Sequence, residues 1–320
     1  MKKFLAIVCA AMMLLSMTAC GGETANDDTY VVGICQLVTH DALDAATEGF
    51  MQALKDELGD KVTFDVQNAA GDSATCSQIA NTFVANDVDL IMANATPALQ
   101  AAVAATEDIP VLGTSVTEYG VALEIENFNG TVGGNVSGTS DLAPLDQQAA
   151  MVKEWFPEAK NVGLLFCSAE ANSKYQVDEI QKMLEKEGIT CTQYSFTDSN
   201  DVQTVAQKAA DESDVIYIPT DNTAASNAPV IREVCTQGEK KVPIIVGEEG
   251  ICKGCGVATL SISYYDLGYT TGKMAAKVLK GEADISTMAV SYSETFTKKY
   301  NKEICDELGL TPPEGYQAIS

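Results

Sequence analysis

Short polar segments directly follow the apolar, strand-like segments of this sequence. They are Thr39-His40-Asp41, Asn94-Ala95-Thr96, Ser115-Val116-Thr117, Thr220-Asp221-Asn222-Thr223 and Glu248-Glu249. A further segment of the same character, Gly138-Thr139-Ser140-Asp141, is expected to link two halves of the chain. Nearly all of these side chains donate or accept hydrogen bonds, and few are of the types that catalyse reactions. Such a set favours a site that holds a small polar ligand unchanged.

The charge of the chain excludes several classes of function. Its 320 residues include 20 Lys and Arg against 45 Asp and Glu, a net charge of −25. Nucleic acid is therefore not expected as a partner, because duplex affinity comes largely from cationic contacts to phosphate. An exported enzyme remains a weak alternative, since an acid–base pair is offered only by His40 with Asp41 or by Glu248 with Glu249. We expect no enzymatic activity and no cofactor.

The cysteines do not indicate a metal site. Cys252-Lys253-Gly254-Cys255 is a C-x-x-C motif, but no second pair and no histidine cluster completes a zinc site. A disulfide between Cys252 and Cys255 and two free thiols are both compatible with the motif. Cys35, Cys167 and Cys191 fall on predicted buried strands and are expected to pack as small apolar residues.

The N-terminus has the layout of an export signal. Lys2 and Lys3 precede an apolar run over residues 4–15, and a small residue, Ala19, precedes Cys20. The pattern resembles a bacterial lipoprotein signal over residues 1–19, in which Cys20 becomes the lipidated N-terminus. A plain secretory signal cut near Ala19 is the alternative. Residues 20–29 are small and polar and are expected to tether the protein to the outer face of the cytoplasmic membrane.

Apolar segments alternate with helical patterns through the rest of the chain. Strands are predicted at 30–37, 62–66, 88–93, 109–113, 162–166, 190–195, 215–218 and 242–246, with helices between them. This alternation predicts an α/β fold of two doubly wound parallel-sheet lobes joined by a hinge. We expect the N-terminal lobe at 30–140, the C-terminal lobe at 141–287, and a return to the N-terminal lobe from about 288 to 320.

Six segments, in order, resemble a known family. They are THDALDAATEGF (39–50), NATPALQAA (94–102), GTSVT (113–117), GTSDLAP (138–144), IPTDNTAAS (218–226) and YYDLGYTTGKMAAKVLKG (264–281). The chain is similar to substrate-binding lipoproteins of bacterial ABC importers with the type I periplasmic-binding fold, and most similar to their tryptophan- and tyrosine-binding (TrpX-like) group. The resemblance implies a hinged receptor that closes on an amino acid and passes it to an ABC permease. We expect this receptor to be a monomer.

An amino acid ligand assigns roles to the polar segments. Because Arg232 lies inside a predicted helix, the carboxylate needs hydroxyls and helix N-termini. We expect the hydroxyls from Thr96, Ser115, Thr117 and Ser140. The ammonium needs an acid, and Asp221 or Glu249 is expected to supply it, with Asp141 behind them. An aromatic side chain needs flat or apolar neighbours, for which Tyr119, Tyr264, Leu37 and Val116 are candidates.

The predicted contact set also has less specific interpretations. It comprises Thr39, His40, Thr96, Ser115, Val116, Thr117, Thr139, Ser140, Asp141, Asp221, Asn222, Glu249 and Tyr264. Thr96, Thr139 and Asp221 are also suited to capping helices, and His40 to bonding a backbone group. The same fold binding a sugar, a nucleoside or a branched-chain amino acid, or serving as a sensory receptor, is the alternative function.

Overall fold

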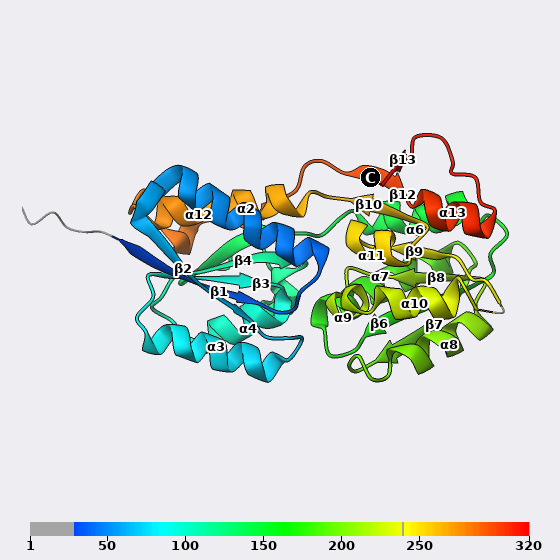
Figure 1. Ribbon diagram of the computed structural model, residues 1–320, viewed down its shortest axis with the longest axis horizontal. Coiled ribbons are helices and arrows are strands. Elements are labelled where there is room, and N and C mark those ends of the chain that lie inside the picture. The colour runs from blue at the N-terminus through cyan, green and yellow to red at the C-terminus, as the bar shows by residue number, and fades with distance from the viewer. Residues whose placement is uncertain (1–28, 239, 320) are drawn as a thin grey trace, which may run out of the picture.

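The chain forms two α/β lobes that lie side by side in the computed structural model, which describes residues 29–238 and 240–319 (Figure 1). The N-terminal lobe has a six-stranded sheet of order β11-β5-β4-β3-β1-β2, and the C-terminal lobe a seven-stranded sheet of order β13-β12-β10-β9-β8-β6-β7. All strand pairs are parallel except β10 with β12. The predicted class of two parallel-sheet lobes is therefore confirmed.

The N-terminal lobe combines two separate parts of the chain. Its strands are β1 (Tyr30–Gln36), β2 (Val62–Asn68), β3 (Leu90–Asn94), β4 (Val111–Val116), β5 (Val136–Ser140) and β11 (Ser291–Tyr292). Its helices are α2 (Asp41–Leu58), α3 (Ser73–Ala85), α4 (Thr96–Ala105), α5 (Tyr119–Ala122) and α12 (Tyr264–Leu279), with 3₁₀ turns η1 (Gly59–Lys61) and η2 (Ile285–Thr287).

The C-terminal lobe has the same strand–helix alternation. Its strands are β6 (Asn161–Cys167), β7 (Thr190–Phe196), β8 (Val215–Ile218), β9 (Ile244–Val246), β10 (Ala258–Ser261), β12 (Thr297–Tyr300) and β13 (Gln317–Ala318). Its helices are α6 (Leu145–Trp155), α7 (Ala171–Lys186), α8 (Val202–Glu212), α9 (Asn222–Ser226), α10 (Ala228–Cys235), α11 (Glu249–Gly254) and α13 (Lys302–Leu308).

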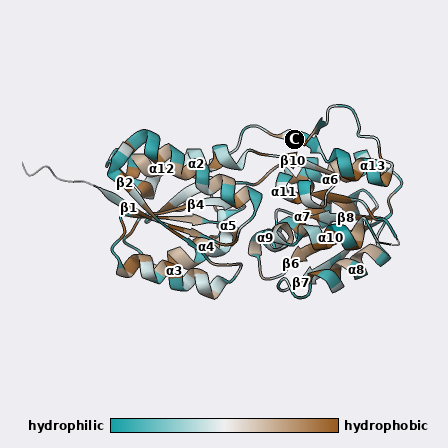
Figure 2. Cartoon of the chain, viewed as in Figure 1, coloured by the Kyte–Doolittle hydropathy of each residue, from teal (hydrophilic) through white to brown (hydrophobic). Residues whose placement is uncertain are grey.

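Apolar spacing explains how the helices pack on the sheets. In α2, Leu43, Phe50 and Leu54 recur at helical intervals and are fully buried against the strands. Gly59 ends this helix with φ 59°, a conformation that glycine adopts at no steric cost. The strands are the most hydrophobic elements, and the helices present their hydrophilic faces outward (Figure 2). Burial of each large apolar side chain contributes about 1.5–3 kcal/mol.

The C-terminal part of the chain is divided between the lobes differently from the prediction. We expected residues 141–287 in the C-terminal lobe and a return to the N-terminal lobe from about 288. Instead, α12 already packs against α2 of the N-terminal lobe, whereas β12 pairs with β10 of the C-terminal lobe (Figure 1). The chain therefore crosses between the lobes three times, after Ser140, after Ser261 and after Tyr292.

Residues 138–141 also differ from their prediction as a linker. Gly138, Thr139 and Ser140 belong to β5, which pairs with β4 in the sheet of the N-terminal lobe. The first crossover begins only after this strand. A strand this rich in glycine and hydroxyls has no apolar signal, so its sequence did not indicate it.

Glycines allow α12 to lie directly on α2. A Cβ atom on Gly268 would lie 1.9 Å from the carbonyl oxygen of Ala46, and one on Gly49 would lie 2.1 Å from that of Tyr265. The two backbones therefore touch, and no larger residue fits at either position. The contact fixes the end of the second crossover to the start of α2, next to the edge where the strands of the lobe end.

Within the described ranges, no helix is long and apolar enough to cross a membrane. The predicted signal peptide (1–19), the lipidation site Cys20 and most of the tether (20–29) lie outside the described residues. Cys252 and Cys255 are buried free thiols, so the disulfide alternative for this pair is wrong.

Candidate ligand-binding site

The first wall of the site comes from the turn between β1 and α2. His40 is the residue before α2, with an extended backbone (φ −163°, ψ 163°), and its side chain does not cap the helix. The ring instead reaches the other lobe, where its Nε2 lies 3.2 Å from Oδ1 of Asn222. This hydrogen bond joins the two lobes across the site.

A bulge in β4 turns Ser115 toward the other lobe. Gly113 pairs with Gly138, and a Cβ on Gly138 would lie only 2.1 Å from the carbonyl oxygen of Gly113. The Tyr119 hydroxyl occupies the remaining space and donates to the carbonyl of Thr139 at 3.1 Å. The register then shifts before Val116, and Ser115 takes φ 53°. Bulges commonly redirect a side chain in this way.

The turn between β3 and α4 is also strained. Ala95 has φ 94°, an uncommon value for a residue with a Cβ, and its N–H donates to the carbonyl of Thr114 at 3.0 Å. Thr96 follows it as the first residue of α4, and its buried Oγ1 has no partner among the described residues. Strained backbone of this kind persists where the surroundings impose it, often at binding sites.

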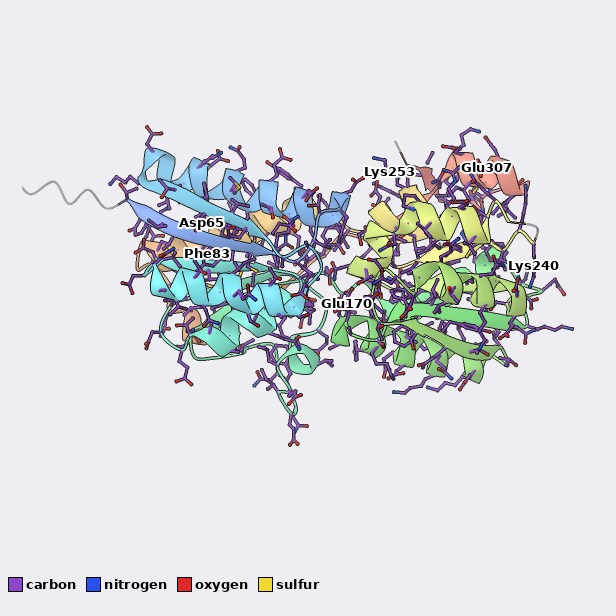
Figure 3. The ribbon with its side chains drawn as sticks, turned by 60° about the horizontal axis from the view of Figure 1, so that its bottom comes forward. Asp65, Phe83, Glu170, Lys240, Lys253 and Glu307 are labelled. Atoms are coloured by element: carbon purple, nitrogen blue, oxygen red, sulfur yellow. The ribbon has the colours of Figure 1, made fainter. Side chains whose placement is uncertain are left out.

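The opposite wall is organised by two carboxylates of the C-terminal lobe. Asp221 caps α9 by accepting from the N–H of Ala224 at 2.7 Å, and its second oxygen accepts from the N–H of Cys167 at 2.7 Å. Glu170 lies where the lobes meet (Figure 3) and accepts from both N–H groups of Asn222, at 3.1 Å from the backbone and 2.6 Å from Nδ2. Both acids therefore hold this wall in place through hydrogen bonds to its own backbone and side chains.

The hinge side of the site is closed by Tyr264, Asp141 and Glu248. The Tyr264 hydroxyl donates to Oδ2 of Asp141 at 2.9 Å. Glu248 caps α11 by accepting from the N–H groups of Gly250, at 2.6 Å, and Ile251. All three side chains are buried.

These walls enclose one narrow cavity between the lobes. Its volume is about 10 Å³, close to the space that one water molecule needs. The lining residues are His40, Leu43, Ser115, Thr117, Asp141, Asn172, Thr220, Asp221, Asn222, Ala225, Glu248 and Tyr264.

Several polar atoms around the cavity are buried without any hydrogen-bond partner among the described residues. In the lining they are His40 Nδ1, Ser115 Oγ, Asp141 Oδ1 and Asn172 Oδ1. Leaving such a group unpaired costs about 1–3 kcal/mol. Their concentration in one cavity indicates that a polar ligand supplies the missing partners.

The cavity is acidic and lacks a protein cation. None of the described lining residues is a lysine or an arginine. Burial raises the pKa of Asp141, and it raises the pKa of Glu248 to about 7. Burial and the neighbouring Glu170 carboxylate together raise the pKa of Asp221 to about 7. Burial also lowers the pKa of His40, which keeps the ring neutral. A ligand with a positive group suits these surroundings.

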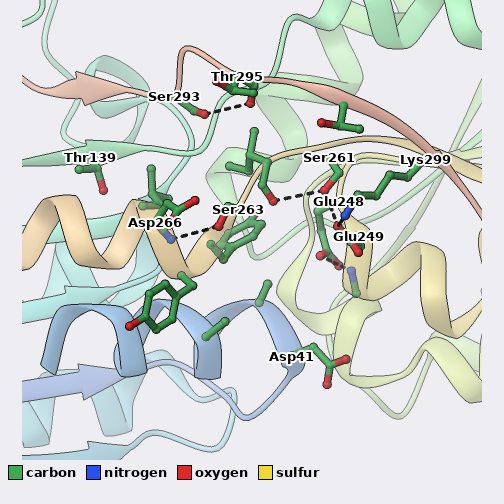
Figure 4. A pocket seen from close by; sticks show the side chains of 18 of the residues that line it. Asp41, Thr139, Glu248, Glu249, Ser261, Ser263, Asp266, Ser293, Thr295 and Lys299 are labelled. Carbon is green, nitrogen blue, oxygen red and sulfur yellow. Dashed lines mark hydrogen bonds and ion pairs between the residues drawn. The ribbon is translucent and has the colours of Figure 1, made fainter. Parts of the chain in front are cut away.

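Glu249 lies outside this cavity. It borders a separate groove of about 770 Å³ beside the crossovers, where it accepts from the Ser261 hydroxyl at 2.5 Å and from Lys299 Nζ at 2.6 Å (Figure 4). Because Lys299 already neutralises it, Glu249 is not available to a ligand's ammonium in the cavity. In this arrangement of the lobes Glu249 therefore lies apart from the cavity, and its contact with the ammonium stays a prediction.

The structure brings only part of the predicted contact set to the cavity. Those that line it are His40, Ser115, Thr117, Asp141, Asp221, Asn222 and Tyr264. The described lining does not include Thr39, Thr96, Val116, Thr139, Ser140 or Glu249.

The predicted residues outside the lining have other contacts. Thr39 accepts from Asn68 at 3.1 Å, and Val116 packs in the core of its lobe. Thr139 Oγ1 lies 2.8 Å from Thr271 Oγ1, and the Ser140 hydroxyl donates to the carbonyl of Thr117 at 2.7 Å. The aromatic candidate Tyr119 is likewise buried in the core.

Asn172 was missed from the sequence, although a signal was present. It lies in the first turn of α7, directly after β6, and the ends of strands are where ligands bind in open α/β sheets. Glu248 was recognised as part of a polar segment but was not chosen, because its neighbour Glu249 was preferred. Sequence alone does not distinguish which of two adjacent acids caps the helix.

Comparisons with known proteins agree with this architecture. Residues 31–318 match the protein family described as ABC transporter substrate binding protein. The chain is 37% identical over 300 residues to a tyrosine-binding protein of Clostridioides difficile (strain R20291). The aligned region covers 88% of this chain and 85% of that protein.

Solved structures are similar over nearly the whole chain. The crystal structure of an ABC domain from Streptococcus pneumoniae in complex with L-Trp has 34% identity and a TM-score of 0.85, covering 91% of this chain and 100% of that one. The ligand-free, open structure of a substrate-binding protein with adhesive properties from Clostridium difficile has 37% identity but a TM-score of only 0.68, covering 91% and 99%. More distant structures, such as a leucine-binding protein from Thermotoga maritima (14% identity, TM-score 0.59, covering 80% and 84%), share the fold alone.

Proposed function

Because the chain belongs to the ABC transporter substrate-binding proteins, a family of solute-binding proteins and not of enzymes, we propose that it binds an aromatic amino acid between its lobes. Tyrosine and tryptophan are the proposed ligands, and an ABC permease is the proposed recipient. The observation that carries the proposal is the set of unpartnered polar atoms in the interlobe cavity.

The cavity offers complementary groups for both charges of an amino acid. Asp141 Oδ1 is buried without a partner among the described residues and suits the ammonium. The hydroxyl of Ser115, which has no partner among the described residues, suits the carboxylate. Thr96 and the first turn of α4, which lie outside the cavity lining in this arrangement, would add donors only if the lobes shift to admit the ligand. Asp141 is preferred over Asp221, whose two oxygens already accept from backbone N–H groups.

The aromatic preference rests on the relatives and on the cavity wall. One relative is named a tyrosine-binding protein, and one similar structure contains L-Trp. Tyr264, Leu43 and Ala225 give the lining flat and apolar surface next to its polar groups.

Because the cavity holds only about one water molecule, the lobes must separate to admit such a ligand and must then rest slightly further apart around it than in this structure. We infer that this structure represents the closed arrangement. Its TM-score is higher with the L-Trp complex than with the open, ligand-free protein, although the open protein is the more identical in sequence. Direct contacts across the gap, His40 with Asn222 and Lys253 with Asp41 at 3.3 Å, agree with closure.

A thermal-shift screen with the twenty amino acids tests the proposal. Tyrosine or tryptophan at 100 times its Kd should stabilise the protein by about 2.7 kcal/mol, and alanine should not. A response to sugars or nucleosides, with none to amino acids, would refute the assignment.

We further propose that Cys20 carries the lipid that holds the protein at the membrane, as a monomer. The support is the order of residues in this segment: a positively charged start at Lys2 and Lys3, an apolar run over residues 4–15, and a small residue, Ala19, before Cys20. Cys20→Ala should release the protein into the soluble fraction. Continued association of the variant with membranes would contradict lipidation at this residue.

A further inference from the structure

We propose that Glu170 and Asn222 are positioning residues that hold the proton of His40 on Nε2, so that Nδ1 accepts a hydrogen bond from the ligand's ammonium group. The inference deepens the proposed function and rests on it. It assigns a specificity-determining role to the one histidine of the chain and a purpose to Glu170, which does not line the cavity.

The first step is the orientation of two amides by Glu170. Its Oε2 accepts from Nδ2 of Asn222 at 2.6 Å and lies 3.4 Å from Nδ2 of Asn172. Its Oε1 accepts from the backbone and hydroxyl of Thr223, at 2.9 Å and 2.8 Å. Both oxygens also accept from backbone N–H groups, those of Asn222 and Thr223, so they act as acceptors and both amides turn their NH₂ groups toward them. Asn172 is held further by donation to the carbonyl of Thr220 at 3.0 Å.

The second step is the tautomer of His40. With its NH₂ group facing Glu170, Asn222 presents Oδ1 to His40 Nε2 at 3.2 Å. Oδ1 is an acceptor, so Nε2 must carry the proton. The carboxylates of Asp41 and Asp44 on α2 and of Glu170 across the gap favour a charged ring, but burial outweighs them and lowers the pKa of His40. In the neutral ring Nδ1 then has a lone pair and no proton.

The third step is the match between acceptors and ligand. His40 Nδ1, Asp141 Oδ1 and Asn172 Oδ1 are all buried, without partners among the described residues, and on the wall of one cavity. A primary ammonium has three N–H donors, and a ligand without this group would leave the acceptors unpaired. Sites built around buried polar groups reject analogues that lack the matching group.

The hydrogen-bonded chain of Glu170, Asn222 and His40, called the relay below, forms only when the lobes are closed. His40 precedes α2 of the N-terminal lobe, whereas Asn222 and Glu170 belong to the C-terminal lobe. In an open protein the ring loses Asn222 and is free to take either tautomer. Closure on the ligand therefore selects the tautomer that the ammonium needs.

Nitrogen NMR of protein labelled with ¹⁵N-histidine tests the relay directly, because His40 gives the only histidine signals. With saturating L-tyrosine, we expect one neutral tautomer with a proton on Nε2 and a shifted, hydrogen-bonded Nδ1. A proton on Nδ1, or a charged ring in the complex, would overturn the inference while leaving tyrosine binding intact. If no aromatic amino acid binds, the proposed function fails and this inference fails with it.

Three variants separate positioning from folding. In Glu170→Gln the new NH₂ group allows Asn222 to flip, and in Asn222→Ala the fixed acceptor is lost, so both should populate the second tautomer in the complex. Glu158→Gln, at an exposed residue, is the matched control and should leave the spectrum unchanged. If both positioning variants fold, bind tyrosine and keep the wild-type tautomer, the relay is wrong.

Affinity measurements give a second readout. Wild type should prefer L-tyrosine over 3-(4-hydroxyphenyl)propionate, which lacks the amine, and this preference should fall about tenfold or more in His40→Phe. Asn222→Ala, whose folding is checked by its melting curve, should reduce the same ratio by a smaller factor. An unchanged ratio in His40→Phe would exclude contact between Nδ1 and the ammonium.

Discussion

Replacing Asp141 by asparagine should change the stability of the free protein and its response to ligand in opposite directions. The carboxylate is buried, one oxygen accepts from Tyr264 at 2.9 Å, and the other has no partner among the described residues. Burial raises the pKa of Asp141, so the folded state binds a proton more tightly than the unfolded state. Ionisation therefore destabilises the free fold as the pH rises above the unfolded pKa, and this cost is complete only above the raised pKa of the folded state. The neutral amide of Asp141→Asn avoids that cost, so the free variant should melt at the same temperature as wild type or higher.

The ligand response should fall instead. Truncating one partner of a buried charge pair costs about 2–5 kcal/mol of binding, or about 30- to 5,000-fold in Kd. At a tyrosine concentration of 100 times the wild-type Kd, wild type gains about 2.7 kcal/mol, whereas a variant with a 100-fold weaker Kd gains about 0.4 kcal/mol. Isothermal titration and melting curves with and without tyrosine measure both effects.

Glu249→Gln is the control, because this acid pairs with Lys299 in the groove beside the crossovers. It should leave the Kd for tyrosine unchanged. Should the Asp141 variant bind tyrosine as tightly as wild type, Asp141 is not the partner of the ammonium. A large loss of affinity in the Glu249 variant would return that role to Glu249, one of the two acids predicted for it from the sequence.

Three further outcomes are expected. Gly268→Ala would place a Cβ 1.9 Å from the carbonyl oxygen of Ala46, so it should lower the free energy of unfolding by about 1–3 kcal/mol. The melting temperature should fall by about 2–4 °C for each kcal/mol lost, and an unchanged melting curve would mean that α2 and α12 are not in backbone contact. Burial in the closed arrangement lowers the pKa of His40, so tyrosine affinity should fall as the pH drops below about 6.5, where the exposed ring takes up a proton. Titration calorimetry should show a smaller fall in His40→Asn, in which only acids such as Asp141 still titrate, and equal pH profiles would exclude a contact between His40 and the ligand. Small-angle scattering should give a smaller radius of gyration with tyrosine than without it, and identical curves would argue against closure.

The two-lobed α/β architecture could be predicted from the sequence, because in most helices and strands the apolar residues that recur at regular spacing are the ones that are buried. Leu43, Phe50 and Leu54 predicted α2 from their spacing, and all three are buried. The predictions failed where the spacing of apolar residues gave no signal or did not distinguish the two lobes. Residues 138–140 form a strand from glycine and hydroxyls, and the amphipathic α12 fits either lobe by its pattern. Close backbone contacts, such as Gly268 with Ala46 and Gly49 with Tyr265, hold it on the N-terminal lobe.

The choice between acids at the site depended on helix caps. Asp221 stands three residues before Ala224, whose N–H it accepts, which is the spacing of an N-cap. Asp141 is followed by an irregular segment, and α6 begins only at Leu145, so its carboxylate has no helix to cap. This difference was readable from the sequence. The positive φ of Ser115 was not, because it depends on how Gly113 and Gly138 approach each other in the sheet.

The same unpartnered atoms that recognise the ligand also oppose closure without it. Four of them line the cavity, and each costs about 1–3 kcal/mol when it is buried without a partner. His40, Ser115 and Asp141 come from the N-terminal side and Asn172 from the C-terminal lobe, so a ligand satisfies all four only when the lobes meet. Water satisfies them in the open arrangement. The ligand therefore binds the closed state more tightly than the open one, which is the condition for a population shift. A receptor whose cavity were fully self-satisfied would close empty and gain nothing from its ligand.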